Sequence, residues 1–370
     1  MKTIMVLIPR MGMGGISKIG AFVANSLLNA GHNVICCSLV KDKATIKLNN
    51  DVIKESVKYP LDDLSIGKLT KAAKKINAIR MLYSLIKKYG VDEIIAFGLD
   101  LARIALVVSQ GKCKVIASER GNPYRYTVKQ MSKYCKVLKK ADYVVFQTNG
   151  AKQAFPASIV EMKSKIIANP AVPRQTIKSQ HTRTGRSGTK RIVYCGRLSP
   201  DKDIPLLITA FSKTVREGYV LNIYGEGIEE TKIRQLIESN NLQQRVFIIK
   251  GCSDVFEKEY NADMFVLTSK EEGMPNALIE ALCEGIPCIA TDCPPGGVSE
   301  LLGDGKRGLL VPVGDVNALA SAIKTFMDNP AEAERYGNLG KEILDLYASE
   351  KIASEWIDLV KLVGNKNEEY

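Results

Sequence analysis

Two carboxylates follow an apolar, strand-like segment in the second half of the chain. Glu272 comes in the loop after the run 264–268. Glu280 comes in the helix-like stretch beyond it, about two turns or roughly 8–12 Å further on at 1.5 Å per residue. Carboxylates at this spacing suit hydrogen bonds to separate hydroxyls of one polyhydroxylated ligand, whereas a glycosidase pair must converge on a single bond. The alternative interpretation of Glu280 is that it is an exposed helix residue without a ligand.

The loop after Glu272 enters the helix through four residues: Gly273, Met274, Pro275 and Asn276. A proline at this position is typical of a first helical turn, whose N–H groups can meet an anion or a sugar hydroxyl. A comparable loop follows the run 191–195, where Arg197 and Lys202 can place two cations on a diphosphate. Two solvated loop charges are the alternative interpretation of that pair.

Glycines also follow the first strand-like run, 4–9, at Gly14 and Gly15. Glycine lets backbone N–H groups approach a phosphate at a helix N-terminus. The pattern is neither the dinucleotide fingerprint nor a Walker A loop, because Ser17 stands where the fingerprint requires glycine and no G-K-[ST] follows. A ligand loop and a plain tight turn therefore both stay open.

The elements that must position these residues alternate regularly along the chain. Continuous apolar, β-branched runs alternate with helix-length amphipathic stretches, which indicates strands buried on both faces. The predicted strands are 4–9, 33–40, 93–97, 114–118, 143–148, 165–168, 191–195, 219–224, 245–249, 264–268, 287–291 and 308–312. This alternation predicts the α/β class with parallel sheets.

A stretch rich in proline, glycine, serine, threonine and basic residues interrupts the alternation and predicts a linker. The 370 residues suit two doubly wound domains. The predicted parts are an N-terminal domain at 1–170, the linker at 171–190, a C-terminal domain at 191–348, and a helix with a polar tail at 349–370 that packs back on the N-terminal domain. The last helices are expected at 330–347 and 349–363. Because such sheets bind ligands at their C-terminal edges, the function is expected in a cleft between the domains.

The net charge of +12 is unevenly distributed. Residues 1–170 contain 28 Lys+Arg and 11 Asp+Glu, whereas residues 191–370 contain 19 and 29. Two helix-like segments, 71–88 and 129–140, are densely basic, as is typical of a surface for anionic membranes; a solvated helix face is the alternative. No nucleic-acid motif accompanies the charge and aromatic residues make up only 6%, so nucleic-acid binding is not expected.

Nine cysteines are scattered without a Cys-x-x-Cys pair, and only two histidines are present. This composition argues against a metal site and is typical of buried thiols in a reducing cytoplasm. The first residues carry no charged lead or cleavage site, so a secretory signal is not expected. No run approaches the ~20 apolar residues of a membrane-spanning helix. We therefore expect a cytoplasmic protein.

The spacing of Glu272 and Glu280 resembles the E-x7-E signature of retaining glycosyltransferases of family 4, which have the GT-B fold. Other features of that family follow in order along nearly the whole chain: Gly14-Gly15, Arg197 with Lys202, Tyr224-Gly225-Glu226-Gly227, Gly251 and the segment 285–292. The resemblance implies two Rossmann-like domains that face a cleft. It also implies that the first domain binds an acceptor and the second a nucleotide sugar.

Carried onto this chain, the resemblance implies that Glu280 accepts hydrogen bonds from the ribose and that Glu272 binds hydroxyls of the donor sugar. Arg197 and Lys202 are expected to bind the diphosphate, with help from the backbone of Gly14-Gly15 and of the turn after Glu272. The base is expected to meet the backbone of three residues: Gly251, Cys252 and Ser253. Fixed cations and N–H groups stabilise the charge that develops on the leaving phosphate, so no metal and no cofactor are expected.

Two segments depart from the family pattern. Many relatives carry a histidine after the fourth strand of the first domain, facing the donor sugar, whereas this chain has the segment 118–123, Ser-Glu-Arg-Gly-Asn-Pro. That segment resembles a subgroup that builds bacterial surface polysaccharides. Glu119, Arg120 or Asn122 is expected to contact the donor sugar or the acceptor, and a structural ion pair is the alternative. Relatives also often carry an acidic residue where this chain has Ile16-Ser17-Lys18.

Together these features predict a hexosyltransferase that is peripheral to the inner face of the cell membrane. It is expected to move a hexose or N-acetylhexosamine from a UDP-linked donor to a polyprenyl-diphosphate-linked glycan, with retention at the anomeric carbon, in polysaccharide or exopolysaccharide biosynthesis. The alternative is a UDP-sugar epimerase of the same fold that needs no acceptor. A nucleic-acid-binding protein is the third, less favoured interpretation.

Overall fold

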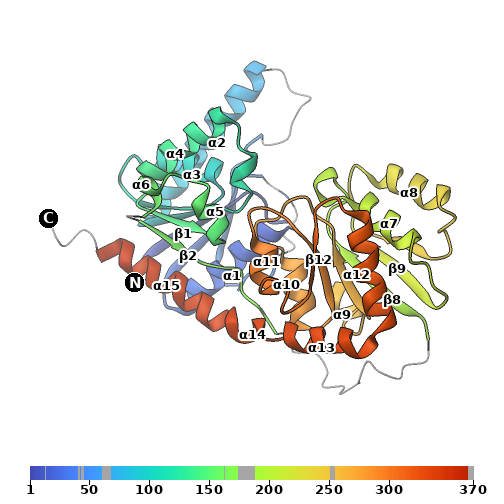
Figure 1. Ribbon diagram of the computed structural model, residues 1–370. Coiled ribbons are helices and arrows are strands. Elements are labelled where there is room, and N and C mark those ends of the chain that lie inside the picture. The colour runs from blue at the N-terminus through green and yellow to red at the C-terminus, as the bar shows by residue number, and fades with distance from the viewer. Residues whose placement is uncertain are drawn as a thin grey trace. The chain divides into compact units, whose positions relative to one another are not determined.

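The computed structural model describes residues 1–12, 14–40, 42, 46–60, 68–161, 163–173, 188–250 and 255–365. The chain forms two compact units, one of Met1–Asn169 with Glu350–Tyr370 and the other of Pro170–Ser349. The first unit thus takes its last helix, α15 (Ser349–Asn365), from the end of the chain, and Figure 1 shows this helix in red beside the strands of that unit. Of the predicted linker, residues 174–187 lie outside the described part of the chain.

A seven-stranded sheet forms the centre of the first unit, in the order β3-β2-β1-β4-β5-β6-β7. Its strands are β1 (Thr3–Ile8), β2 (Asn33–Ser38), β3 (Ile53–Ser56), β4 (Glu93–Phe97), β5 (Lys114–Ser118), β6 (Tyr143–Phe146) and β7 (Ser164–Ile166). All of these neighbours pair in parallel. The strand order reverses between β1 and β4, as in doubly wound folds.

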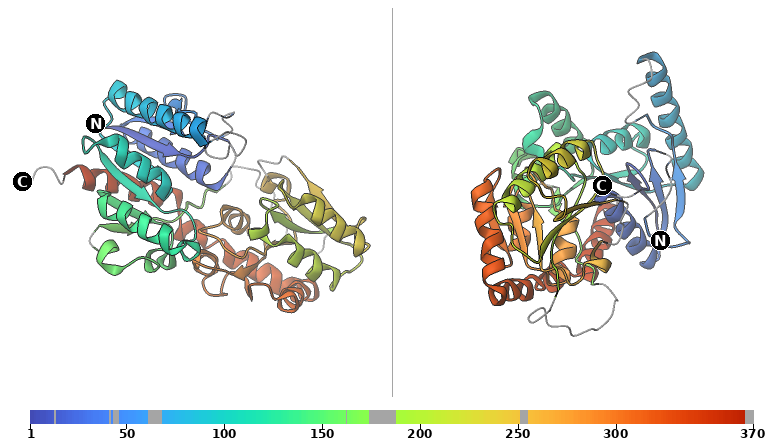
Figure 2. Two further views of the ribbon diagram at one scale, coloured as in Figure 1. Left: turned by 90° about the horizontal axis from the view of Figure 1, so that it is seen from above. Right: turned by 90° about the vertical axis from the view of Figure 1, so that its right-hand side faces the viewer.

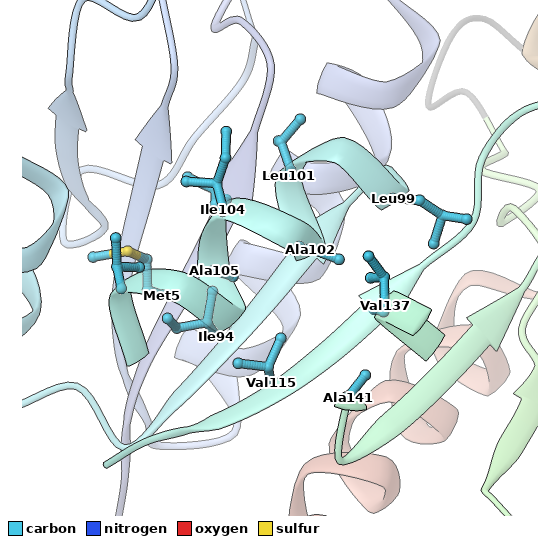
Figure 3. Packing of buried hydrophobic residues seen from close by; sticks show 14 of the residues in the cluster. Met5, Ile94, Leu99, Leu101, Ala102, Ile104, Ala105, Val115, Val137 and Ala141 are labelled. Atoms are coloured by element: carbon cyan, nitrogen blue, oxygen red, sulfur yellow. The ribbon is translucent and has the colours of Figure 1, made fainter. Parts of the chain in front are cut away.

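Helices cover both faces of this sheet (Figures 1 and 2). They are α1 (Gly15–Asn29), α2 (Lys68–Tyr89), α3 (Leu99–Ser109), α4 (Val128–Lys140), α5 (Asn149–Gln153), α6 (Ala157–Val160) and a 3-10 turn, η1 (Pro123–Arg125). Because both faces are covered, the strands are apolar throughout, and every side chain from Ile4 to Ile8 is fully buried. Figure 3 shows the core on one face, where Ile94 and Val115 of the sheet meet Ala102 of α3 and Val137 of α4.

The second unit is built around a six-stranded sheet in the order β10-β9-β8-β11-β12-β13, again with parallel neighbours. Its strands are β8 (Lys190–Cys195), β9 (Tyr219–Tyr224), β10 (Val246–Ile249), β11 (Met264–Leu267), β12 (Cys288–Asp292) and β13 (Leu309–Pro312). Its helices are η2 (Pro200–Lys202), α7 (Ile204–Ser212), α8 (Glu230–Ser239), α9 (Val255–Lys258), α10 (Asn276–Cys283), α11 (Gly297–Leu302), α12 (Val316–Asp328), α13 (Pro330–Gly340) and α14 (Ile343–Leu346). The predicted α/β class with two doubly wound domains is therefore confirmed.

All the predicted strands are present, with ends within two residues of those expected. The sequence missed β3, a short edge strand in which Ile53 and Lys54 are exposed, so it lacks the continuous apolar run that marks the others. The helix expected at 330–347 is two helices, α13 and α14. Within the described residues, none of the helices is both long enough and apolar enough to span a lipid bilayer.

Candidate functional site

Three loops meet at the C-terminal edge of the sheet in the second unit. The loop after β8 and the loop after β11 are joined by the backbone hydrogen bond from Lys270 N to Asp201 O, at 2.8 Å. The loop after β11 is joined to the loop after β12 by the bond from Glu272 N to Pro294 O, at 3.1 Å. Because parallel sheets bind ligands at this edge, these loops form the wall of the candidate site.

Two buried threonines fix the strand ends that carry these loops. The Thr268 hydroxyl donates to Lys202 O at 2.9 Å, and the Thr291 hydroxyl donates to Ser269 O at 2.5 Å. Both threonines are fully buried. A buried hydroxyl needs a partner, and here each partner is a loop carbonyl, so the threonines hold the loops in one register.

Lys202 and Glu272 form the centre of the site. Lys202 Nζ lies 2.5 Å from Glu272 Oε1 and 3.6 Å from Asp201 Oδ2. The Ser269 hydroxyl donates to the same Glu272 oxygen at 2.7 Å. The side chains of Lys202 and Glu272 are only 13% and 14% exposed, so a partly buried cation is held between carboxylates with little screening from water.

Asp201 links this centre to the second predicted cation. Arg197 Nη2 lies 3.6 Å from Asp201 Oδ2, and the Arg197 side chain is 76% exposed. Burial acts to raise the pKa of Asp201, but the Ser199 hydroxyl, Lys202 and Arg197 outweigh it and leave the pKa below its ordinary value. The ionised Asp201 carboxylate therefore lies beside both predicted cations, and Lys202 in turn contacts Glu272. The sequence analysis had not singled out Asp201.

The segment from Gly273 to Asn276 leads from this centre into α10, as predicted. Met274 and Pro275 are buried, whereas Gly273 and Asn276 are half-buried. Pro275 precedes the first helical residue, Asn276, and Glu280 lies half-buried within the helix. Glu272 is thus a loop residue and Glu280 a helical one, in the arrangement expected from their spacing.

Glycine is required where α11 begins. A Cβ on Gly297 would overlap the carbonyl oxygen of Gly273, so the loop that carries Glu272 packs directly on this helix. A Cβ on Gly225 would likewise overlap the carbonyl oxygen of Gly196, beside Arg197. These close backbone contacts fix the walls of the site, and the glycine-rich segments 225–227 and 296–297 were their only signal in the sequence.

The other predicted donor contacts lie elsewhere. Gly251, Cys252 and Ser253 are outside the described residues. Gly14 and Gly15 belong to the first unit, where Gly14 precedes the first residue of α1 and its carbonyl accepts from Lys18 N at 3.0 Å. Their role in phosphate binding stays a prediction.

In the first unit, Glu119 and Arg120 follow β5 and turn to different neighbours. Glu119 Oε1 accepts from Gly121 N at 2.7 Å and from the Tyr126 hydroxyl at 2.9 Å. Arg120 donates to the Ser118 hydroxyl at 2.7 Å and to Asn169 Oδ1 at 3.2 Å. The two side chains thus have separate hydrogen-bond partners, and their contact with the donor sugar or the acceptor stays a prediction.

Both side chains are almost completely buried, Glu119 at 2% and Arg120 at 8% exposure. The Arg120 guanidinium also lies 4.9 Å from the ring centre of Phe97 and 5.5 Å from that of Trp356. Asn122 accepts from Tyr124 N at 3.1 Å and so caps η1. Glu119 Oε2 and Arg120 Nη2 are buried without a partner, so each retains one group that a ligand or water can satisfy.

Burial raises the pKa of Glu119, which predicts a pH-dependent effect of the substitution Glu119→Gln. A carboxyl whose pKa is higher in the folded protein than in the unfolded chain stabilises the fold at low pH. This stabilisation is lost as the pH rises from the pKa of the unfolded chain through the pKa of the folded protein. We expect Glu119→Gln, which keeps an acceptor oxygen for Gly121 and Tyr126, to gain stability relative to the wild type as the pH rises from 4.5 to 8. Thermal unfolding of both proteins across this range measures the difference; a difference that shrinks with rising pH would contradict it.

Within the described ranges, no three His, Cys, Asp or Glu side chains gather as a metal site would need. The expectation of a metal-free, cofactor-free site stays a prediction. Cys293, next to the loop of Glu272, is buried, and this burial raises the pKa of its thiol to about 12. It is therefore a protonated core residue at neutral pH.

Two doubly wound units with a ligand edge of this kind define the GT-B class of fold, and solved structures agree. The sucrose-phosphate synthase of Thermosynechococcus elongatus superposes with a TM-score of 0.83 at 19% identity, over 99% of this chain and 100% of that one. HepE of Anabaena, solved with UDP and glucose, superposes with a TM-score of 0.82 at 16% identity, over 98% of this chain and 100% of HepE. These similarities establish the fold.

Residues 176–343, a little under half of the chain, match the family model for "Glycosyl transferases group 1". The predicted recognition as a GT-B glycosyltransferase is thereby confirmed at the level of the group. The assignment to family 4, and the roles that its E-x7-E signature implies, stay predictions.

Curated relatives carry related names. The chain is 30% identical to an exopolysaccharide phosphotransferase of Streptomyces coelicolor over 61% of its own length and 24% of the relative's. It is 32% identical to a poly(ribitol-phosphate) alpha-N-acetylglucosaminyltransferase of Staphylococcus aureus, over 46% of its own length and 35% of the relative's. It is 28% identical to an N-acetylgalactosaminyltransferase of Campylobacter jejuni whose named substrate is a diphospho-undecaprenol glycan, over 58% and 59%. The matches to these relatives thus span between about a quarter and three fifths of their lengths.

Proposed function

We propose that this protein is a retaining glycosyltransferase of bacterial surface-polysaccharide assembly. It transfers a sugar from a nucleotide donor, a UDP-hexose or UDP-N-acetylhexosamine, to a glycan carried on a polyprenyl diphosphate. The observation that carries the proposal is the contact between Lys202 Nζ and Glu272 Oε1, 2.5 Å apart, at the ligand edge of the second sheet. The family match of residues 176–343 and the names of the relatives support it.

The chemistry follows from the charges of that site. Transfer breaks the bond between the anomeric carbon and the diphosphate oxygen and forms a bond from the same carbon to an acceptor hydroxyl. The hydroxyl proton passes to the leaving phosphate oxygen, so no protein base is required. Negative charge grows on the leaving phosphate, and Lys202 with Arg197 stabilises it. Glu272, oriented by Ser269, holds hydroxyls of the donor sugar, and Glu280 holds the ribose.

The donor class rests on comparison as well as on charge. HepE, which shares the fold, was solved with UDP and glucose. Two cations and two carboxylates on one sheet edge suit a ligand that combines a diphosphate with several hydroxyls. None of the relatives named above is an epimerase, and no observation favours that alternative.

The acceptor and its location form the second half of the proposal. A relative from Campylobacter jejuni is named for a diphospho-undecaprenol acceptor. Helices α2 and α4 of the first unit carry twelve Lys and Arg between them and no Asp or Glu. Such helices suit an anionic membrane at about 1 kcal/mol per well-placed cation. The protein is accordingly proposed to act in the cytoplasm, at the inner face of the membrane.

A thermal-shift panel of UDP-, GDP- and ADP-sugars tests the donor half. A ligand at a hundred times its Kd stabilises the fold by about 2.7 kcal/mol, or roughly 5–10 °C for a domain of this size. We expect UDP-sugars alone to give such a shift. Stabilisation by GDP- or ADP-sugars only would show the donor assignment to be wrong. Conversion of UDP-N-acetylglucosamine into a second UDP-sugar without acceptor would instead establish an epimerase.

A further inference from the structure

An apolar pocket of about 480 Å³ opens in the first unit between η1 and α4. It is lined by Pro123, Tyr124, Tyr126, Val128, Met131, Ser132, Cys135 and Ala154. Its volume falls in the range of roughly 300–1,000 Å³ that small-molecule sites occupy. Ser132 is its single aliphatic hydroxyl, so the pocket suits a hydrocarbon group better than a sugar or a nucleotide.

Large apolar groups at this pocket are open to solvent. Val128 is 89% exposed and Tyr124 is 58% exposed, although both belong to the pocket wall. Scattered apolar residues on a surface need no explanation, but apolar residues that share one concave pocket mark a binding site. The pocket therefore has the character of a site that is filled by an apolar ligand.

The pocket is joined to the ligand edge of the first sheet. Tyr126, in its wall, donates its hydroxyl to Glu119 Oε1 at 2.9 Å. Glu119 directly follows the last residue of β5 and keeps Oε2 buried without a partner. A ligand in the pocket is thus one side chain away from the residues that the sequence analysis assigned to donor-sugar or acceptor contact.

Cations flank the pocket residues on α4. α4 carries five lysines and no acidic residue. Lys133 Nζ forms an ion pair with Asp100 Oδ1 at 2.8 Å. Lys129 and Lys136 are exposed. Lys129 and Lys136 lie three before and four after the pocket residue Ser132, so all three share one side of the helix. Apolar pocket and exposed cations together complement an amphiphile that has a hydrocarbon chain and an anionic head.

We propose that this pocket binds the isoprenoid chain of a lipid diphosphate, with Lys129 and Lys136 facing the diphosphate. The inference rests on the proposed function, since it assigns the lipid part of the acceptor to a place in the first unit. Binding of the isoprenoid chain here places the acceptor on the unit that contains Glu119. The chain therefore contributes to acceptor affinity independently of the sugar that is attached.

Calorimetry with farnesyl diphosphate and with inorganic pyrophosphate tests the inference. We expect farnesyl diphosphate to bind at least tenfold more tightly, because pyrophosphate lacks the chain. Val128→Glu places a carboxylate in the mouth of the pocket, at a helix start where an acidic residue is favourable to folding. This variant is expected to reduce the affinity ratio to less than threefold. The matched control is Val107→Glu, at an exposed position of α3, which is expected to keep the wild-type ratio.

Alkylation of cysteines locates the ligand. Cys135 lines the pocket and Cys283 belongs to the second unit, and both are half-buried. Farnesyl diphosphate is expected to slow modification of Cys135 and to leave Cys283 unchanged. Three results would each overturn the proposal. They are equal affinity for farnesyl diphosphate and pyrophosphate, a wild-type ratio of these affinities in Val128→Glu, and no protection of Cys135 by farnesyl diphosphate. Equal protection by phosphatidylglycerol vesicles would overturn it too, because the occupant would then be a membrane acyl chain.

The nucleotide panel separates this inference from the proposed function. If UDP-sugars stabilise the protein but farnesyl diphosphate binds no better than pyrophosphate, the pocket assignment fails and the glycosyltransferase proposal stands. If no nucleotide sugar stabilises the protein, the proposed function fails whatever the pocket binds.

Discussion

Replacing Lys202 by methionine is expected to lower kcat for sugar transfer by about 10²–10³-fold, the loss typical of removing one fixed group that stabilises developing charge. Methionine keeps the apolar length of the side chain, so the substitution removes the ammonium group and little volume. Without it, Glu272 and Asp201 lose the cation that lies 2.5 Å and 3.6 Å from them. The leaving phosphate loses its buried positive partner at the same time.

Steady-state kinetics with a saturating acceptor measures this effect, and circular dichroism checks the fold. Lys213→Met is the matched control, because Lys213 is exposed in the same unit and donates to Asn317 Oδ1 at 2.7 Å. That variant is expected to transfer at the wild-type rate. A kcat within threefold of wild type for Lys202→Met would show that Lys202 does not stabilise the leaving group.

Gly297→Ala is expected to have the largest effect on stability among the substitutions considered. The new Cβ would overlap the carbonyl oxygen of Gly273 and lie 3.2 Å from Met274 Cα, so backbone rather than a side chain must move. Overpacking of this kind costs about 1–3 kcal/mol, or roughly 3–10 °C in Tm. Since Gly273 begins the segment between Glu272 and α10, the affinity for the nucleotide sugar should fall with it.

Differential scanning calorimetry with and without the stabilising nucleotide sugar measures both effects. Ser299→Ala, also in α11, is the control, because it removes only a hydroxyl that donates to Gly296 O at 3.2 Å. Its Tm is expected to change by less than about 3 °C. If Gly297→Ala unfolds at the wild-type temperature and binds the nucleotide equally well, the contact between α11 and the Glu272 loop does not support the site.

The strands were predictable because parallel strands buried on both faces leave continuous apolar runs in the sequence. β3 was not, since Ile53–Ser56 is a short edge strand with an exposed Lys54. The two helices α13 and α14 were predicted as one, because the helical pattern of the sequence continues across residues 341–342.

The site was predictable only where its signal is local. Glu272, Glu280 and the segment that enters α10 lie within nine residues of one another, so spacing and helix geometry place them. The contact between Lys202 and Glu272 joins residues 70 positions apart, and the roles of Asp201, Ser269 and Thr268 depend on how three loops meet. Such contacts depend on tertiary packing and leave no periodic pattern in the sequence.

The environment of Glu119 and Arg120 shows the same limit. Their position after a predicted strand indicated a functional loop. The sequence did not decide between a contact with the donor sugar or acceptor and a structural ion pair. Their contacts depend on Tyr126 of the same loop and on Asn169 and Trp356, which come from distant segments. The apolar pocket beside them was likewise invisible in the sequence, because its wall combines η1, α4 and Ala154.

Transfer of a labelled sugar from a UDP-sugar to a polyprenyl-diphosphate-linked glycan tests the central claim most directly. The wild-type protein is expected to release UDP and to extend the lipid-linked glycan by a sugar whose anomeric configuration is that of the donor. Glu272→Ala is expected to lower this transfer by at least 10²-fold, because the donor sugar loses the carboxylate that Lys202 and Ser269 orient. The account would be contradicted if Glu272→Ala transferred sugar at the wild-type rate from every donor. It would also be contradicted if the wild-type protein extended no lipid-linked glycan from any nucleotide sugar.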